Sequence, residues 1–407
     1  MSDASIPAAL NEQLANQLSQ VIGFIYPNEI ETHWSILIVV YPYLTGIVAG
    51  AFILASLVKV FNVVEVQPIY RLALLAALSF MLIAGLPLQL HLGHPERAYE
   101  IFMTPQPTSA MAMFGFVYLW YLLGILLIEV WLEYREQLVL MAREARGIMK
   151  PVYRALSLWS NDVSPEAVAW DHRVSKIVTI IGIPSAFLLH GYVGFIFGSI
   201  KANPWWGSVL MPIVFLMSAI VSGIAMVMLI YMVISLLRNE KIDMRCLDKV
   251  GLFLLVALIV DFALEGLEFI HRVYQNEESL KILSELISVK LFNSLVIMQV
   301  ALGMLLPLLI LALVRSRRLN DDMRRIMYFL AALLIQVGIF SMRWNVVIGG
   351  QLFSKSFRGL MAYKMELTGI ESLWMALVLL ALPFIILTVL NYLLPTRWLE
   401  ERALAAH

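Results

Sequence analysis

Residues 184–223, PSAFLLHGYVGFIFGSIKANPWWGSVLMPIVFLMSAIVSG, decide the fold. This stretch holds two apolar runs of helical length, separated by the short polar segment 201–204 and the paired tryptophans Trp205 and Trp206. Tryptophan is enriched where a membrane meets water. The stretch therefore predicts two membrane-spanning helices that meet at a short aqueous turn.

The composition of the whole chain agrees with a membrane protein. Apolar residues make up 61% of the 407 residues and charged residues only 14%, more apolar surface than a water-soluble core can bury. The 29 basic and 29 acidic residues cancel, so net charge gives no sign of a nucleic-acid partner. The single cysteine, Cys246, excludes an internal disulfide and a cysteine-ligated iron–sulfur cluster within the chain.

Apolar runs of about 20 residues, the length that a bilayer core demands, recur along the chain. They predict nine spans, near residues 34–58, 70–92, 111–132, 174–198, 205–236, 249–271, 289–314, 324–347 and 370–394. The segment 273–288 is too polar to span, and a short amphipathic helix is expected around residues 10–25. The predicted fold class is an all-α integral membrane protein.

A short internal sequence repeat predicts how the spans are grouped. Residues 45–50 read TGIVAG and residues 218–223 read SAIVSG, so small residues recur at the same place in spans 1 and 5. Small residues spaced in this way let membrane helices pack closely. We therefore expect two similar four-helix bundles with one extra C-terminal helix. The expected parts are an extracytoplasmic segment (1–33), a first bundle (34–198, with a cytoplasmic loop at 135–172), a second bundle (205–349), a ninth span (370–394) and a cytoplasmic tail (395–407).

The distribution of basic residues predicts the orientation. When loops are assigned alternately to the two sides, 20 of the 29 Lys and Arg residues fall on one side and 9 on the other. Cytoplasmic loops carry the excess of Lys and Arg. We therefore expect the N-terminus outside and the C-terminus in the cytoplasm.

Four histidines of the first four spans fall on the predicted outer side. His33 lies where span 1 begins, His91 and His94 where span 2 ends, and His190 about eight residues inside span 4. An ionisable group at that depth is costly and usually functional, whereas His33 and His94 could equally be solvated at helix ends. The inner half of the spans offers no histidine, which excludes a pair of haem ligands across the membrane.

Span 6 carries four ionisable residues, Asp261, Glu265, Glu268 and His271. Steps of four, three and three residues place them on one helical face. Asp261 lies near mid-bilayer, where a charge costs about 2.5–3.5 kcal/mol, so it should be protonated or paired, with Arg343 of span 8 as the candidate partner. The set predicts a proton path, and the alternative is a structural ion pair. Glu129, a lone acid in span 3, is interpreted as a snorkelling or helix-packing residue.

Several of these residues carry a family resemblance. The most specific pieces are HLGHPERA at 91–98, residues 190–211, residues 268–272 and RWN at 343–345. With these motifs the chain resembles, over nearly its whole length, the NrfD/PsrC family of quinone-reactive membrane subunits, which includes polysulfide-reductase, HybB-like and DsrP-like branches. The family commonly has Leu-Gly-Arg-Pro in the first motif, and here His94 replaces the arginine.

The resemblance implies a subunit of a larger complex rather than a stand-alone enzyme. It implies a quinone, such as menaquinone or ubiquinone, bound near the outer face, with no haem, iron–sulfur cluster or metal site in this chain. The implied partners are a ferredoxin-like iron–sulfur subunit and a catalytic subunit of molybdopterin, hydrogenase or cytochrome type. The implied location is the inner membrane of a bacterium or archaeon, and proton translocation is left open.

A quinone needs an apolar slot and one or two hydrogen-bonding groups, and quinol oxidation needs a base such as histidine. The apolar run around His190 meets both needs, so we expect the quinone ring there, with His91 and His33 close by as further catalytic residues. The predicted quinone contacts are His33, Trp34, His91, His94, His190 and Tyr192. The alternative for His190 is a hydrogen bond to a neighbouring helix.

Two other functions compete with this one. An internal repeat with buried acids also fits a secondary transporter or a proton-conducting membrane protein. The predicted repeat is parallel, however, and no span is clearly broken by Gly or Pro at mid-membrane. An inert anchor would need neither Asp261 nor His190.

Overall fold

The computed structural model describes residues 12, 15–275, 279–317 and 319–396. In this part of the chain nine helices are long and apolar enough to cross a membrane, which confirms the predicted spans. They are α2 (Leu37–Lys59); η1, α3 and α4 (Val64–Val66, Gln67–Ala84, Leu86–His91); α6, η3 and α7 (Ala110–Leu119, Trp120–Leu126, Leu127–Glu144); α9 (Pro165–Gly198); α10 (Met211–Leu237); α11 (Met244–Gln275); α12, η4 and α13 (Leu280–Leu286, Ile287–Leu305, Leu306–Ser316); α14 with η5 (Asp321–Val347, Gly349–Gln351); and α15 (Leu373–Leu393). The short elements are β1 (Ile22–Gly23), η2 (Pro95–Arg97), α5 (Glu100–Met103), α8 (Met149–Leu156) and β2 (Gly359–Leu360).

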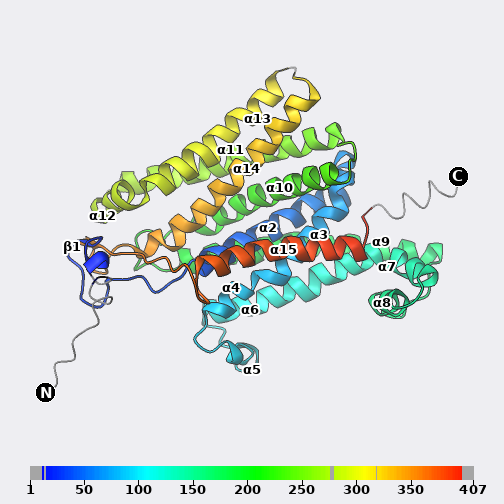
Figure 1. Ribbon diagram of the computed structural model, residues 1–407, viewed down its shortest axis with the longest axis horizontal. Helices are drawn as coiled ribbons and strands as arrows, with labels where there is room; N and C mark the ends of the chain where they lie inside the picture. The colour runs from blue at the N-terminus through cyan, green and yellow to red at the C-terminus, as the bar shows by residue number, and fades with distance from the viewer. Residues whose placement is uncertain (1–11, 13–14, 276–278, 318, 397–407) are drawn as a thin grey trace.

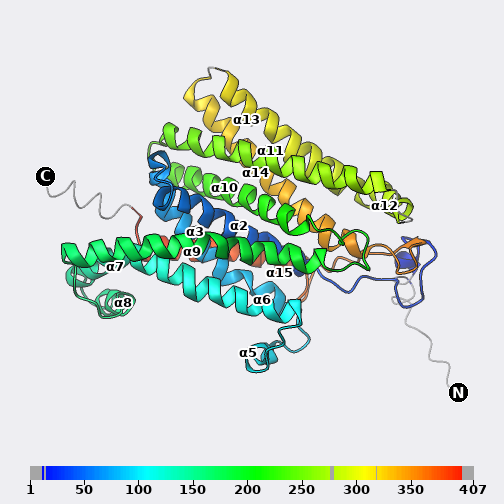
Figure 2. The same cartoon turned by 180° about the vertical axis from the view of Figure 1, so that it is seen from behind.

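The long helices run side by side, with α2 and α10 in the middle (Figure 1). In both views α14, α11 and α13 lie on one side of this pair and α6 and α7 on the other (Figure 2). The ninth span, α15, packs on α3 and α2. We call the end that carries β1 and β2 the outer end, after the predicted topology, and the end near α8 the inner end.

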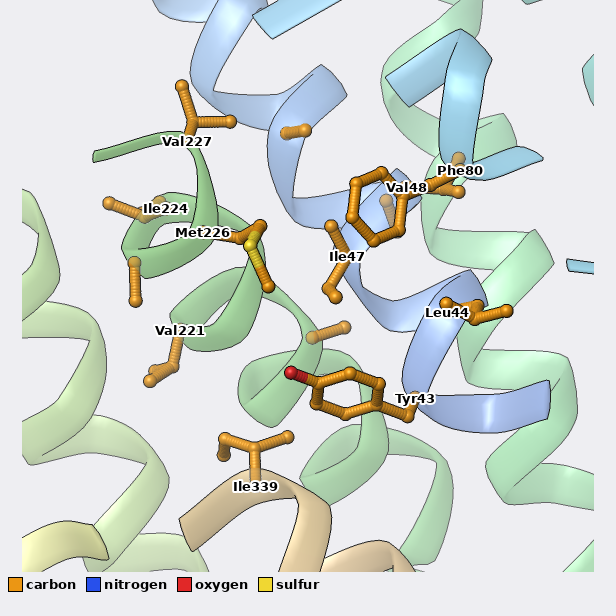
Figure 3. Packing of buried hydrophobic residues seen from close by; sticks show 14 of the residues in the cluster. Tyr43, Leu44, Ile47, Val48, Phe80, Val221, Ile224, Met226, Val227 and Ile339 are labelled. Carbon is orange, nitrogen blue, oxygen red and sulfur yellow. The ribbon is translucent and has the colours of Figure 1, made fainter. Parts of the chain in front are cut away.

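Small residues explain why α2 and α10 can lie in the centre. A Cβ placed on Gly50 would lie 2.8 Å from the Cα of Gly223, so the two backbones touch where any larger residue would separate them. The repeated segments are therefore packed against each other. Buried aliphatic side chains from both helices fill the space around this crossing (Figure 3).

A polar clamp joins α2, α14 and α10 within this apolar packing. The hydroxyl of Tyr43 donates to Gln336 Oε1 at 2.8 Å, and Gln336 Nε2 donates to the carbonyl of Ser222 at 2.7 Å. Because α14 contacts α2 and α9 contacts α10 as well, helices of the two predicted bundles share one interior. The division into residues 34–198 and 205–349 stays a prediction.

The helices extend further into polar sequence than predicted. The loop expected at 135–172 shortens to residues 145–164, because α7 continues to Glu144 and α9 begins at Pro165. Arg135 and Asp171, both buried, form an ion pair at 2.6 Å between these extensions. Pairing of this kind lets charged segments stay helical and buried, and sequence periodicity does not reveal it.

The prediction of an amphipathic helix at 10–25 is wrong in its second half. Ile22 and Gly23 form β1, which pairs antiparallel with β2. Gly23 has a φ of +74°, a left-handed backbone conformation that an α-helix does not contain and that suits glycine. The predicted tail 395–407 lies outside the described residues except for 395–396, as do residues 1–11 and 13–14 of the N-terminal segment.

Candidate functional site

His190 lies at the centre of the molecule, where α9, α2 and α14 meet. Its side chain is fully buried, with Nε2 at 3.0 Å from Arg343 Nη2 and Nδ1 at 3.3 Å from Thr45 Oγ1. Arginine can only donate hydrogen bonds, so Nε2 accepts and Nδ1 carries the proton toward Thr45. The ring stacks at 5.8 Å on Phe215 of α10. His190 therefore links the helices of both halves.

Arg343 carries the charge of this cluster. Its guanidinium donates to Ser218 Oγ at 2.7 Å and lies 4.2 Å from the ring centre of Phe215. The predicted partner, Asp261, is also fully buried, but neither of its carboxylate oxygens has a hydrogen-bond partner among the described residues. Asp261 and Glu265 interact with Arg343 through their charges rather than through a direct hydrogen bond.

Besides the cluster around Arg343, a second set of polar residues, which we call the second polar chain, runs from α11 through η4 to α14. Gln299 Nε2 donates to Glu265 Oε2 at 2.7 Å, and Asn345 Nδ2 donates to Gln299 Oε1 at 2.8 Å. Ser294 Oγ donates to Asn345 Oδ1 at 2.5 Å. The other oxygen of Glu265, Oε1, is buried and has no partner among the described residues.

The π-helical geometry of η4 makes this chain possible. In an α-helix, residues five apart point about 140° away from each other. In a π-helix the hydrogen bonds run from i to i+5, so Ser294 and Gln299 come to the same side and both reach Asn345. Gln299 was not predicted as a site residue, although a glutamine flanked by apolar residues inside the predicted span 289–314 was an available signal.

The second polar chain borders a cavity of about 420 Å³ between α10, α11, η4 and α14, which we call the second-half cavity. Most of its lining is apolar. Its polar lining residues are Glu265, Glu268, Arg272, Gln299 and Asn345.

The outer part of the predicted proton path is less continuous than its spacing indicated. Glu268 pairs with Arg272 at 2.7 Å, and Arg272 also donates to the carbonyls of Pro204 and, at 3.1 Å, Trp205. Glu268 is thus part of a rim that fastens α11 to the α9–α10 turn. His271 is exposed and does not join the buried residues.

The remaining predicted quinone contacts lie at the outer end. His91 Nδ1 is 2.9 Å from Glu371 Oε2 and 3.4 Å from Ser35 Oγ. His94 is exposed and pairs with Glu96, and His33 is exposed. No contact in the described chain joins any of these three histidines to the ring of His190. Glu371 lies two residues before the start of α15. It was missed because it is distant in sequence from the other site residues.

The two aromatic residues predicted to contact the quinone, Trp34 and Tyr192, also lie apart from the His190 ring. Trp34 stacks on Trp206 with 5.4 Å between ring centres. Tyr192 stacks on Phe114 at 6.2 Å. Both rings therefore pack against other parts of the protein, and neither contacts the His190 ring in the described structure.

Glu129 is fully buried, so the snorkelling interpretation is wrong. Ser175 Oγ and Thr179 Oγ1 of α9 donate to its Oε1 at 2.9 and 2.8 Å. These two hydrogen bonds tie α7 to α9, as the helix-packing interpretation expects.

Known proteins resemble this chain over most of its length. A selenate reductase subunit of Mesobacillus selenatarsenatis is 32% identical over 323 residues, which cover 77% of this chain and 73% of that protein. A putative dimethyl sulfoxide reductase membrane subunit of Halobacterium salinarum is 29% identical, over 58% of this chain and 52% of that protein. Protein NrfD of Escherichia coli is 26% identical, over 57% of this chain and 72% of that protein. The family model described as polysulphide reductase, NrfD, matches residues 27–355, so the chain belongs to the NrfD family.

Proposed function

We propose that this chain is the quinone-reactive membrane subunit of a respiratory reductase complex. It exchanges electrons between membrane quinone or quinol and a ferredoxin-like iron–sulfur protein at the outer end, which passes them to or from a catalytic partner. Membership of the NrfD family and similarity to proteins named as selenate and dimethyl sulfoxide reductase subunits support this role. The inner membrane of a bacterium or archaeon is the proposed location.

The observation that carries the proposal is the pair of His91 and Glu371, which we call the outer dyad. The carboxylate holds Nδ1 at 2.9 Å, and Nε2 has no hydrogen-bond partner in the described structure. A carboxylate on Nδ1 fixes the tautomer and orientation of an imidazole, so that the other nitrogen can accept a proton. The side chains of His91 and Glu371 are 23% and 37% exposed, so the outer dyad is open to a ligand.

The outer dyad suits one half of quinol oxidation. A quinol hydroxyl donates its hydrogen bond to His91 Nε2, and the proton passes to the imidazole as two electrons leave for the iron–sulfur partner. The second quinol proton goes to water at the same face, which leaves the quinone. In quinone reduction the same steps run in reverse. In this scheme His190, enclosed by Thr45, Arg343 and Phe215, joins α9 to α2, α14 and α10 and is not a quinone contact.

The test uses the intact complex, purified in detergent with its partner proteins, and follows electron transfer from a short-chain quinol to an artificial acceptor. We expect His91→Gln to lower turnover tenfold or more and Glu371→Gln to lower it several-fold. His94→Gln is the matched control, because His94 also pairs with a carboxylate at 2.9 Å but is 74% exposed. Unchanged turnover in His91→Gln, with normal iron content, would place the reaction elsewhere.

A second role, proton conduction, is favoured by the buried acid Asp261. Its two unpartnered oxygens lie inside the bundle, where an unsatisfied polar group is costly. We propose that Asp261, Glu265 and Glu268 form the path, with Arg343 and His190 beside it. Secondary transport without electron transfer is the competing function, and a complex that lacks bound quinone and iron would support it.

A further inference from the structure

The second-half cavity has the size and lining of a small-molecule site. Its volume of about 420 Å³ falls within the range of about 300–1,000 Å³ typical of ligand pockets. Apolar residues such as Phe262, Leu295 and Val300 form most of the wall. Three of the polar residues, Glu265, Gln299 and Asn345, are joined by hydrogen bonds, as in sites where a few polar groups orient a largely apolar ligand.

The polar part of the wall offers a free hydrogen-bonding position. Glu265 Oε2 already accepts from Gln299, but Glu265 Oε1 is buried with no partner among the described residues. An unsatisfied buried carboxylate oxygen in a folded protein calls for a partner that completes it. Because Glu265 lines the cavity, a ligand in the cavity can supply that partner.

The cavity is reached from the lipid side. Phe269 of α11 and Val296 of η4 line it and are 54% and 37% exposed on the apolar surface of the bundle. A ligand with a hydrocarbon tail can therefore place its head in the cavity and leave the tail in the bilayer. The ion pair of Glu268 and Arg272 forms part of the cavity wall.

The charges decide between the two kinds of membrane molecule that fit. The lining also includes Arg272, but its guanidinium is already held by Glu268 and by the carbonyls of Pro204 and Trp205. An anionic phospholipid headgroup would therefore place its phosphate beside the carboxylate of Glu265 with no free cation among the lining residues, which costs repulsion. An acyl chain alone would leave Glu265 Oε1 without a partner. A quinone head is neutral, accepts at its carbonyls when oxidised and donates from its hydroxyls when reduced, so it complements both Gln299 and Glu265.

We propose that the second-half cavity is a second quinone-binding site, in which Glu265 and Gln299 hold the oxygen end of a prenylated quinone or quinol. It is distinct from the outer dyad, which lies at the ends of α4 and α15 and shares no lining residue with it. The site binds a molecule of the class named in the proposed function, but its occupation does not require that His91 be reactive. Two sites on one chain would let it hold one quinone while another exchanges with the membrane pool.

Gly266 provides a clean way to close the site. It lines the cavity, and a Cβ placed on it would meet no atom within 4 Å. The Cβ of Gly266→Phe therefore meets open space, its ring can extend into the cavity, and replacing glycine inside a helix favours the helix. Glu265→Leu instead removes the carboxylate that would bind the ligand and leaves the cavity open. Leu309→Phe is the control, because Leu309 is 62% exposed on the apolar surface of α13 and does not line the cavity.

The experiment is photolabelling of the intact complex in membranes with an azido-quinone of short tail, followed by peptide mass spectrometry. We expect labelled peptides from α11 and η4, with labelling reduced at least tenfold in Gly266→Phe and in Glu265→Leu but not in Leu309→Phe. Labelling of α11 and η4 that persists in Gly266→Phe would overturn the proposal. So would displacement of the label by phospholipid but not by excess unlabelled quinone.

The result separates this site from the outer dyad. His91→Gln should leave labelling of α11 and η4 unchanged whether or not it lowers turnover. If Gly266→Phe abolishes both labelling and turnover while His91→Gln affects neither, the second-half cavity binds quinone and the proposed reaction at the outer dyad is wrong. If His91→Gln lowers turnover and no peptide of α11 or η4 is labelled in the parent, the second-half cavity does not bind quinone and the proposed reaction at the outer dyad stands.

Discussion

Replacing Arg343 with methionine would remove the charge at the centre of the buried cluster while keeping a side chain of similar length. The guanidinium bonds to His190 Nε2 at 3.0 Å and to Ser218 Oγ at 2.7 Å, and it lies over the ring of Phe215. Its positive charge also acts on Asp261. The substitution therefore removes hydrogen bonds, a cation–π contact and charge compensation together.

The expected loss follows from what each partner retains. His190 Nε2 is left buried without a partner, which costs about 1–3 kcal/mol, whereas Ser218 keeps its bond to the carbonyl of Phe215. The cation–π contact adds about 0.5–2 kcal/mol. Removing one member of a buried charge cluster costs about 3–5 kcal/mol as a whole, and protonation of Asp261 limits the loss. We expect the free energy of unfolding to fall by about 3–5 kcal/mol.

The assay is unfolding by sodium dodecyl sulfate in mixed micelles, followed by circular dichroism. Asp261→Asn in the Arg343→Met background should recover at least about 1 kcal/mol, because coupled neighbours are non-additive. Arg358→Met, at an exposed arginine, is the control and should change stability by no more than about 0.5 kcal/mol. A loss below about 1 kcal/mol in Arg343→Met, or strictly additive effects with Asp261→Asn, would refute the reasoning.

Three further outcomes are expected. Asp261→Asn alone should leave assembly intact while slowing quinone turnover or abolishing proton coupling in proteoliposomes; unchanged activity and coupling would favour a structural role. Gly338→Val should destabilise the protein by several kcal/mol in the same unfolding assay, since a Cβ there would press into the backbone of Gly303, and a stable variant would contradict that packing. Burial raises the pKa of Tyr363 to about 12, so the stability that its neutral hydroxyl contributes is complete below about pH 10 and is lost as the pH rises toward 12. Tyr363→Phe should therefore flatten the fall in the free energy of unfolding over this pH range. An unchanged fall would show that Tyr363 does not cause it.

The nine spans could be predicted because a bilayer imposes one length and one composition on every crossing. The ends of the helices could not, because tertiary pairs extend them. Arg135 and Asp171 lie in what reads as a charged loop, yet each neutralises the other inside the folded structure. Likewise, β1 and β2 are only two residues each and pair across most of the length of the chain, Ile22 with Leu360 and Gly23 with Gly359.

Several residues of the candidate site could be predicted from the sequence, but Glu371 and Gln299 were missed, and the arrangement of the site could not be predicted. The spacing of Asp261, Glu265 and Glu268 placed them on one helix face, and depth singled out His190. Their partners come from other helices, and Gln299 reaches its position through the π-helical turn of η4, which hydrophobic periodicity does not signal. Nor does any spacing in the chain indicate that Arg343 would bond to His190 rather than to Asp261.

The paired tryptophans that mark the membrane interface also connect the outer dyad to the second-half cavity. Trp206 stacks on Trp34, the neighbour of Ser35, which contacts His91. Trp206 Nε1 also donates to the carbonyl of Val346, a residue of the cavity wall. A Cβ at Gly350 would occupy the place of the Trp206 indole, so glycine there is what lets the ring reach that carbonyl. A packed ring and a hydrogen bond therefore connect the surroundings of the outer dyad to α14 at the cavity wall.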